Sequence, residues 1–120
     1  MSTAKQTNSD FQYPGSIDGE IVPVPALGGS TSVAYTGTSA AMTSDVGTTF
    51  TDVSQNWAIL RITSTSDCFM KQATTPTAVA DGTCHFLPAG IPQDIRVHKD
   101  YKLAFIQLSS AGSAYITALV

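Results

Sequence analysis

The side chains in this chain that could do chemistry are two cysteines, two histidines and nine carboxylates. The nearest approach to a metal site is Cys84-His85 together with Cys68. Structural zinc takes four ligands, and neighbouring residues of a strand point in opposite directions, so these three do not make a zinc site. A Cys-His nucleophile would need the same two neighbours to converge, with a third group that orients the base. We expect no metal site and no catalytic cysteine.

The positions of the carboxylates are typical of turns and do not indicate a pair of catalytic acids. Asp67, Asp81, Asp94 and Asp100 fall at turns or strand ends, where aspartate most often bonds to its own backbone. A glycosidase needs two acids across a cleft, and a domain of this size and type offers little cleft. The glycines lack phosphate-loop spacing. We therefore expect no enzyme activity and no cofactor.

Cys68 and Cys84 have two interpretations. Strand alternation places Cys68 with Met70, and Cys84 with Phe86, on inward faces. The two cysteines would then be either reduced, buried thiols that pack as small hydrophobes, or a disulfide if the protein reaches an oxidising compartment.

The composition limits the class of partner. Only 12% of residues are charged, about half the usual share. The six Lys and Arg are scattered, so we expect no nucleic-acid partner. No run of 18 apolar residues occurs, and the start of the chain lacks the apolar stretch of a signal peptide. We expect that the protein is made in the cytoplasm and does not associate with a membrane.

Short apolar runs separated by turn residues predict the elements that carry these side chains. Such a pattern is typical of an all-β sandwich or barrel. The clear strands are Trp57–Thr63, Cys68–Lys71, Cys84–Leu87, Ile95–Lys99, Lys102–Leu108 and Ala114–Val120, and weaker ones are Thr31–Thr36 and Val46–Val53. We expect an antiparallel, jelly-roll-like sandwich of about eight strands over residues 31–120, with almost no helix.

In two of these strands, the sequence pattern predicts which side chains are buried and which face is covered. In Trp57–Thr63, alternation points Ala58, Leu60 and Ile62 into the core. Lys102–Leu108 does not alternate, because both of its faces are apolar. We therefore expect its second face to be covered by the N-terminal arm (residues 1–30) or by another subunit, with Leu103 and Phe105 as subunit contacts.

Residues 1–30 form a separate region, an extended N-terminal arm. Val22-Pro23-Val24-Pro25 is predicted to be extended, because a residue before proline avoids helical geometry. The arm has too many large apolar residues for a linker, and its anchors would be Phe11, Tyr13, Ile17, Ile21, Val22 and Val24. Two hypotheses stay open: the arm docks on a partner, or it packs on its own sandwich.

Four aromatic residues are candidates for a sugar-binding platform, namely Trp57, Tyr101, Phe105 and Tyr115. Trp57 and Phe105 lie within apolar runs, which favours core or subunit contact for both. The tyrosines suit the rim of a sheet, where one end is apolar and the other wet.

From Val33 onward, an ordered series of short motifs resembles a family of small β-sandwich virion proteins of tailed bacteriophages. The matching segments are Thr36–Ala41, Leu60–Phe69, Pro76–Ala78, Phe86–Gly90, Leu103–Gln107 and Ala111–Thr117. The family pattern has glycine before Lys102 where this chain has Asp100-Tyr101, so we expect that loop to differ.

The resemblance implies a structural component of the virion without catalytic residues. The preferred function is a capsid decoration or cement protein that binds the head shell and reinforces it. Its partners would be the major capsid protein or other virion proteins, and its own copies in a dimer or trimer. Two alternatives stay open: a receptor- or glycan-binding module of a fibre or tail tip, and a head–tail or tail structural subunit.

Overall fold

The structure is a computed structural model, and it describes residues 26–120. This part of the chain is all-β, with a single short helix, α1 (Val46–Thr49). The strands are β1 (Leu27–Tyr35), β2 (Ala40–Ala41), β3 (Trp57–Ser64), β4 (Cys68–Ala73), β5 (His85–Leu87), β6 (Gln93–His98), β7 (Lys102–Gln107) and β8 (Gly112–Leu119). The predicted all-β class and the number of strands are confirmed.

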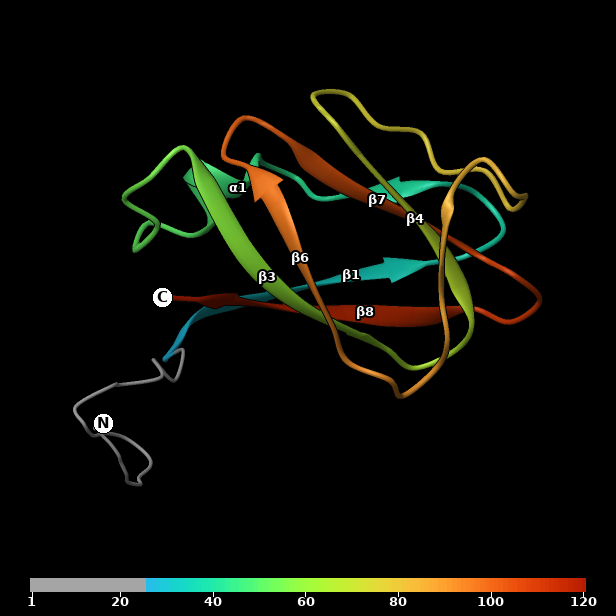
Figure 1. The fold of residues 1–120 in the computed structure, drawn as a ribbon. Helices are drawn as coiled ribbons and strands as arrows, with labels where there is room; N and C mark the ends of the chain where they lie inside the picture. The colour runs from blue at the N-terminus through green and yellow to red at the C-terminus, as the bar shows by residue number, and fades with distance from the viewer. Residues whose placement is uncertain (1–25) are drawn as a thin grey trace, which may run out of the picture.

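The eight strands form two antiparallel sheets that face each other (Figure 1). Sheet A has the order β1-β8-β3-β6, and sheet B has the order β2-β7-β4-β5. Apart from the β4–β5 hairpin, every connection passes from one sheet to the other. This is the strand order of a jelly roll, which confirms the predicted architecture.

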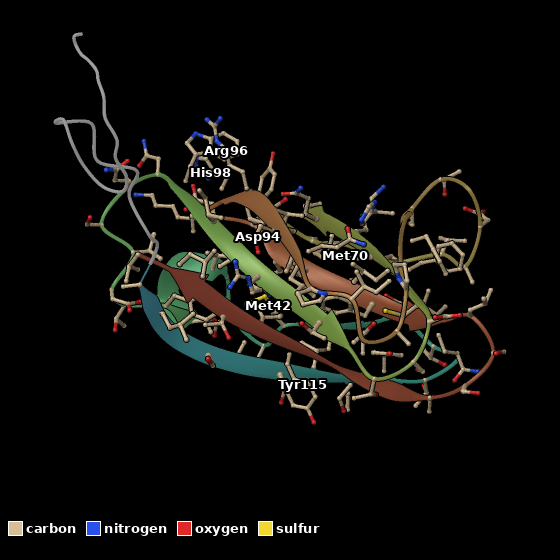
Figure 2. The ribbon with its side chains drawn as sticks, turned by 60° about the horizontal axis from the view of Figure 1, so that its bottom comes forward. Met42, Met70, Asp94, Arg96, His98 and Tyr115 are labelled. Carbon is tan, nitrogen blue, oxygen red and sulfur yellow. The ribbon has the colours of Figure 1, made fainter. Side chains whose placement is uncertain are left out.

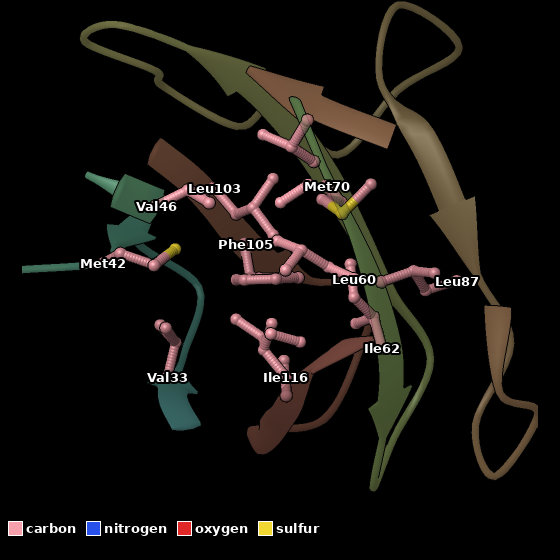
Figure 3. Packing of buried hydrophobic residues seen from close by; sticks show 14 of the residues in the cluster. Val33, Met42, Val46, Leu60, Ile62, Met70, Leu87, Leu103, Phe105 and Ile116 are labelled. Atoms are coloured by element: carbon pink, nitrogen blue, oxygen red, sulfur yellow. The ribbon is translucent and has the colours of Figure 1, made fainter. Parts of the chain in front are cut away.

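The core lies between the sheets and follows from strand alternation. In β3, Ala58, Leu60 and Ile62 are buried as predicted, and the residues between them are exposed or half-buried. Figure 3 shows Leu60, Phe105 and Ile116 projecting into the same space. The cluster comprises Val33, Tyr35, Met42, Val46, Phe50, Ala58, Leu60, Ile62, Cys68, Met70, Leu87, Val97, Leu103, Phe105, Ala114, Ile116 and Ala118. This apolar burial is the main stabilising term of the fold.

The strand predicted over Val46–Val53 is wrong, because that segment contains α1. Asp45 is the N-cap, and its Oδ1 accepts a hydrogen bond of 2.8 Å from Thr48 N. Val46 N and Gly47 N donate to the carbonyls of Tyr101 and Lys99. The cap and these two bonds satisfy backbone donors that a helix start leaves free.

The boundary predicted between arm and sandwich is also corrected. β1 begins at Leu27, which pairs with Leu119 of β8. Ala26 and Val120 exchange two backbone hydrogen bonds of 2.9 Å. A bulge follows between Leu27 and Ser30, where Gly29 N donates to Asp52 Oδ2. Residues 26–30 therefore belong to the sandwich and not to the arm.

The subunit contact predicted at Leu103 and Phe105 is wrong as well. Both side chains are completely buried in the core of their own sandwich. Strand alternation places Ala104 and Ile106 on the outer side of β7, where Ile106 is only half-buried. The connection between β4 and β5 lies against this side of sheet B, since Ala78 N donates to Ser39 Oγ just before β2. Part of the second apolar face is thus covered by the chain itself.

Candidate interaction surfaces

The two cysteines are free, and the strand register explains why. Cys68 pairs with Leu87, and Cys84 is three residues before Leu87 in the chain, so it lies three residues away from the position opposite Cys68. Three residues of strand span about 10 Å, which exceeds the Cα separation of a disulfide. Cys68 is buried as predicted, and desolvation raises the pKa of its thiol. Cys84 is only half-buried, and its Sγ accepts a hydrogen bond from Val79 N.

The inward face predicted for Cys84 and Phe86 is wrong. Leu87 is the buried residue of β5, and Phe86 is 40% exposed. The phase of β5 is set by its partner strand, because paired residues point to the same side of a sheet. Phe86 pairs with Phe69, which lies between the inward Cys68 and Met70.

The polar groups make local structural contacts. Asp67 Oδ1 accepts from Ala89 N, and Asp81 Oδ1 accepts from Thr83 N, both at 2.8 Å. Asp81 thus bonds to the backbone of its own turn, as predicted, whereas Asp67 bonds to backbone 22 residues away in the sequence. His85 Nε2 lies 2.7 Å from Gln93 Oε1 and joins the edges of the two sheets. Among residues 26–120, no three His, Cys, Asp or Glu side chains lie close enough together to hold a metal ion.

Exposed apolar side chains gather at one end of the outer face of sheet A. We call this group the Trp57 corner, and it consists of the exposed Leu27, Trp57, Ile59 and Val120 together with the half-buried Leu119. The register places Leu27, Leu119 and Ile59 side by side on three neighbouring strands. Leu27 is 70% exposed, Ile59 is 50% exposed and Trp57 is 46% exposed. Exposed groups of this kind mark interaction sites more often than isolated apolar residues do.

The Trp57 corner is hollowed on both sides of Ile59. A depression of about 300 Å³ is lined by the loop 52–55, Trp57, Ala58, Ile59, Leu119 and Val120. A second groove of about 510 Å³ runs along Ile59, Asp94–Arg96, Leu119 and Val120. Both have sizes in the range of ligand pockets, and both are lined by Ile59 and by the end of β8.

Charged groups border the Trp57 corner along β6. The Arg96 guanidinium lies 4.5 Å from the centroid of the Trp57 ring, and the His98 ring meets Trp57 edge-on with centroids 5.0 Å apart. Arg61 binds Asp94 through two hydrogen bonds of 2.8 and 3.0 Å. Figure 2 shows Asp94, Arg96 and His98 along this side of the sheet. The apolar corner thus has a polar rim, as many protein interfaces do.

The four aromatic candidates do not form one platform. Phe105 is buried and Tyr101 packs against the core, whereas Trp57 and Tyr115 are exposed. Trp57 is therefore not a core residue, contrary to one of the two expectations for it. Tyr115 pairs with Thr63, six residues along β3 from Trp57, so the two rings are separated by about 20 Å of strand. Arg96 already occupies the neighbourhood of the Trp57 ring.

A second apolar group, which we call the sheet B patch, lies on the outer face of the other sheet. It consists of Ile106, Phe69 and Phe86, which are side by side on β7, β4 and β5. The two phenylalanine rings lie 5.5 Å apart between centroids, at an interplanar angle of 57°. The outward apolar residue of β7 is therefore Ile106, one position away from the residues that the sequence indicated.

The predicted arm anchors are not part of this geometry. Phe11, Tyr13, Ile17, Ile21, Val22 and Val24 lie outside the described residues.

We expect stability to fall in acid because three aspartates are tied to hydrogen-bond donors. Hydrogen bonds from Arg61 lower the pKa of Asp94 below its ordinary value of 3.8. Bonds from Thr48 and Thr83 lower the pKa values of Asp45 and Asp81 in the same direction. The unfolded chain then takes up protons at a higher pH than the folded one, so the contribution is present above pH 4, roughly, and lost as pH falls through the folded-state values.

Urea midpoints measured between about pH 5 and about pH 2.5 test this. The variant Asp94→Asn should lose less of its midpoint over that range than the wild type does. An equal loss in both would contradict a role for the Arg61–Asp94 pair.

Comparison of the chain with protein-family models, with curated protein sequences and with solved structures gives no match. In the part of the chain that the structure describes, no helix has the length and apolar character needed to cross a membrane.

Proposed function

We propose that the chain is a structural protein of a bacteriophage virion, and specifically a capsid decoration or cement protein that binds the head shell and reinforces it. One observation carries this proposal: exposed and half-buried apolar side chains lie in rows on the outer faces of both sheets. The motif order from Val33 onward, which resembles small virion sandwich proteins, supplies the particle context.

The surface chemistry suits repeated contact with other proteins. With 12% charged residues, few ions would be stranded when the faces are covered. The sandwich would serve as a rigid spacer with a contact surface on each side. A specific interface of ordinary size buries about 800 Å² on each partner, and many copies on one shell multiply a modest single contact by avidity.

We assign the sheet B patch to the shell. Its two aromatic rings offer rigid apolar area at low entropic cost, which is the character of interface hot spots. The N-terminal segment would add a second contact to capsid subunits through Phe11, Tyr13 and Ile17, which are the predicted anchors farthest from Ala26 in the sequence.

The substitution Phe86→Asp tests this assignment by sedimentation of purified protein with empty heads. We expect at least about tenfold weaker binding, because a charge in a desolvated aromatic contact costs more than 1.4 kcal/mol. Tyr115→Asp is the matched control, since Tyr115 is also an exposed aromatic residue but lies on the outer face of sheet A. It should bind as the wild type does.

Equal binding by both variants and the wild type would remove the sheet B patch from the mechanism. Imaging of particles that carry the labelled chain tests the location. Copies spread over the head support decoration, whereas a single ring at the neck or density at a fibre tip would support the head–tail and receptor alternatives instead.

A further inference from the structure

The Trp57 corner lies where the N-terminal segment joins the sandwich. Ala26 is hydrogen-bonded to Val120, which itself lines the depression of about 300 Å³ beside Trp57. Twenty-five residues precede Ala26, and the four nearest to it are Val22-Pro23-Val24-Pro25. The most apolar exposed site on sheet A is thus adjacent to the most proline-dense part of the chain.

The chemistry of this tetrapeptide fits the depression. Alternating valine and proline favour an extended or polyproline backbone that pays little entropy on binding. Proline-rich segments of this kind dock on grooves lined by aromatic side chains. The depression offers Trp57 on one wall and Ile59, Leu119 and Val120 on the other.

The stiffness that this sequence predicts argues against binding of the tetrapeptide to its own corner. Ala26 pairs with Val120 at the end of β8, and a segment in which valine and proline alternate would be expected to continue in the direction of β1 beyond that end. The corner extends across the strands instead, from Leu27 through Leu119 to Ile59. To reach it, the chain would have to reverse within Val22–Pro25, where each valine precedes a proline and is restricted to extended geometry.

We propose that residues Val22–Pro25 of a second copy occupy the Trp57 corner. Because each copy has its donor segment and its acceptor corner at the same end of the sandwich, two copies can exchange segments reciprocally about a two-fold axis. This inference goes beyond the proposed binding to the head shell. It concerns contact between two copies of the purified protein, so it can be tested without any shell.

Trp57 is the only tryptophan, so its fluorescence reports directly on the corner. The test compares the full-length chain with the full-length variant Val22→Asp/Val24→Asp, by light scattering and acrylamide quenching over a wide range of concentrations. We expect the wild type to be a dimer with blue-shifted, protected Trp57 emission. The variant should be a monomer with exposed Trp57, and dilution of the wild type should produce the same change.

The matched control is Phe11→Asp/Tyr13→Asp, which puts the same two charges about ten residues earlier in the sequence and should leave the dimer intact. A monomeric wild type with protected Trp57 would show that the segment folds onto its own corner, which overturns the proposal. A dimer that persists in the Val22→Asp/Val24→Asp variant overturns it too, as does loss of the dimer in both variants. A wild type with exposed Trp57 at every concentration also overturns it. Circular dichroism of each variant checks that the sandwich is folded.

Discussion

The substitution Phe105→Ala is expected to lower the free energy of unfolding by about 3–5 kcal/mol, which is the usual cost of removing a buried phenylalanine ring. Phe105 is completely buried between the sheets, and its ring centroid lies 6.3 Å from that of Tyr35. Domains of this size are stable by about 5–15 kcal/mol, so one substitution removes a large share. Urea unfolding at neutral pH, followed by circular dichroism, measures the change.

Phe86→Ala is the control for this experiment. The two phenylalanines have the same chemistry, but Phe86 projects from the outer face of sheet B and is 40% exposed. Its truncation should cost at most about 1 kcal/mol, because the site is open to water before the change. If Phe105→Ala cost no more than Phe86→Ala, the alternation of β7 described above would be reversed, and Phe105 would be the surface residue.

The contrast between β3 and β7 shows how far alternation predicts a face. In β3, polar and charged residues such as Arg61 and Thr63 interrupt the apolar set, so only one face can be buried. In β7, Leu103, Ala104, Phe105 and Ile106 are consecutive. Both phases fit such a run, and the sequence therefore predicts the strand without deciding which residues point inward.

Short elements were harder to predict because their neighbours determine them. β5 has three residues, and its facing follows from pairing with β4 and not from its own pattern. The helix α1 has two local signals in the sequence. Asp45 is a favourable N-cap residue, with Thr48 three residues later. Val46 and Phe50 are apolar, have the spacing of one helical turn and are both buried.

The Trp57 corner could not be predicted from the sequence for another reason. It depends on the register that aligns Leu27 with Leu119 and Leu119 with Ile59. These residues are far apart in the chain, and a slip of one residue in either pairing would move the side chains to the other face. The sequence indicates a sparsely charged chain, but which residues lie beside one another across the strands is known only from the structure.

The substitution Gly112→Ala is expected to destabilise the fold by about 2 kcal/mol, because the added methyl group has no room. A Cβ at Gly112 would lie within 2.7 Å of Ser66 Oγ, Thr65 Oγ1 and Tyr35 Oη. These oxygens hold the strand ends together: Tyr35 Oη donates to Ser66 O at 2.7 Å, and Ser113 N donates to Thr65 Oγ1 at 2.9 Å. Ser66 and Thr65 can rotate, but the Tyr35 ring is fixed in the core, so its bond to Ser66 must yield.

The control for Gly112→Ala is Gly82→Ala, where no atom lies within 4 Å of the added methyl group and the change in stability should stay within about 0.5 kcal/mol. A second comparison isolates the cause. In the background Tyr35→Phe, which already lacks the hydroxyl, Gly112→Ala should cost less than it does in the wild type, because residues in contact are not additive. Urea unfolding of the four proteins of this cycle gives the coupling between Gly112 and Tyr35. A cost that is the same in both backgrounds would show that the hydroxyl of Tyr35 does not restrict position 112, and that the need for glycine there arises from Thr65 and Ser66 alone.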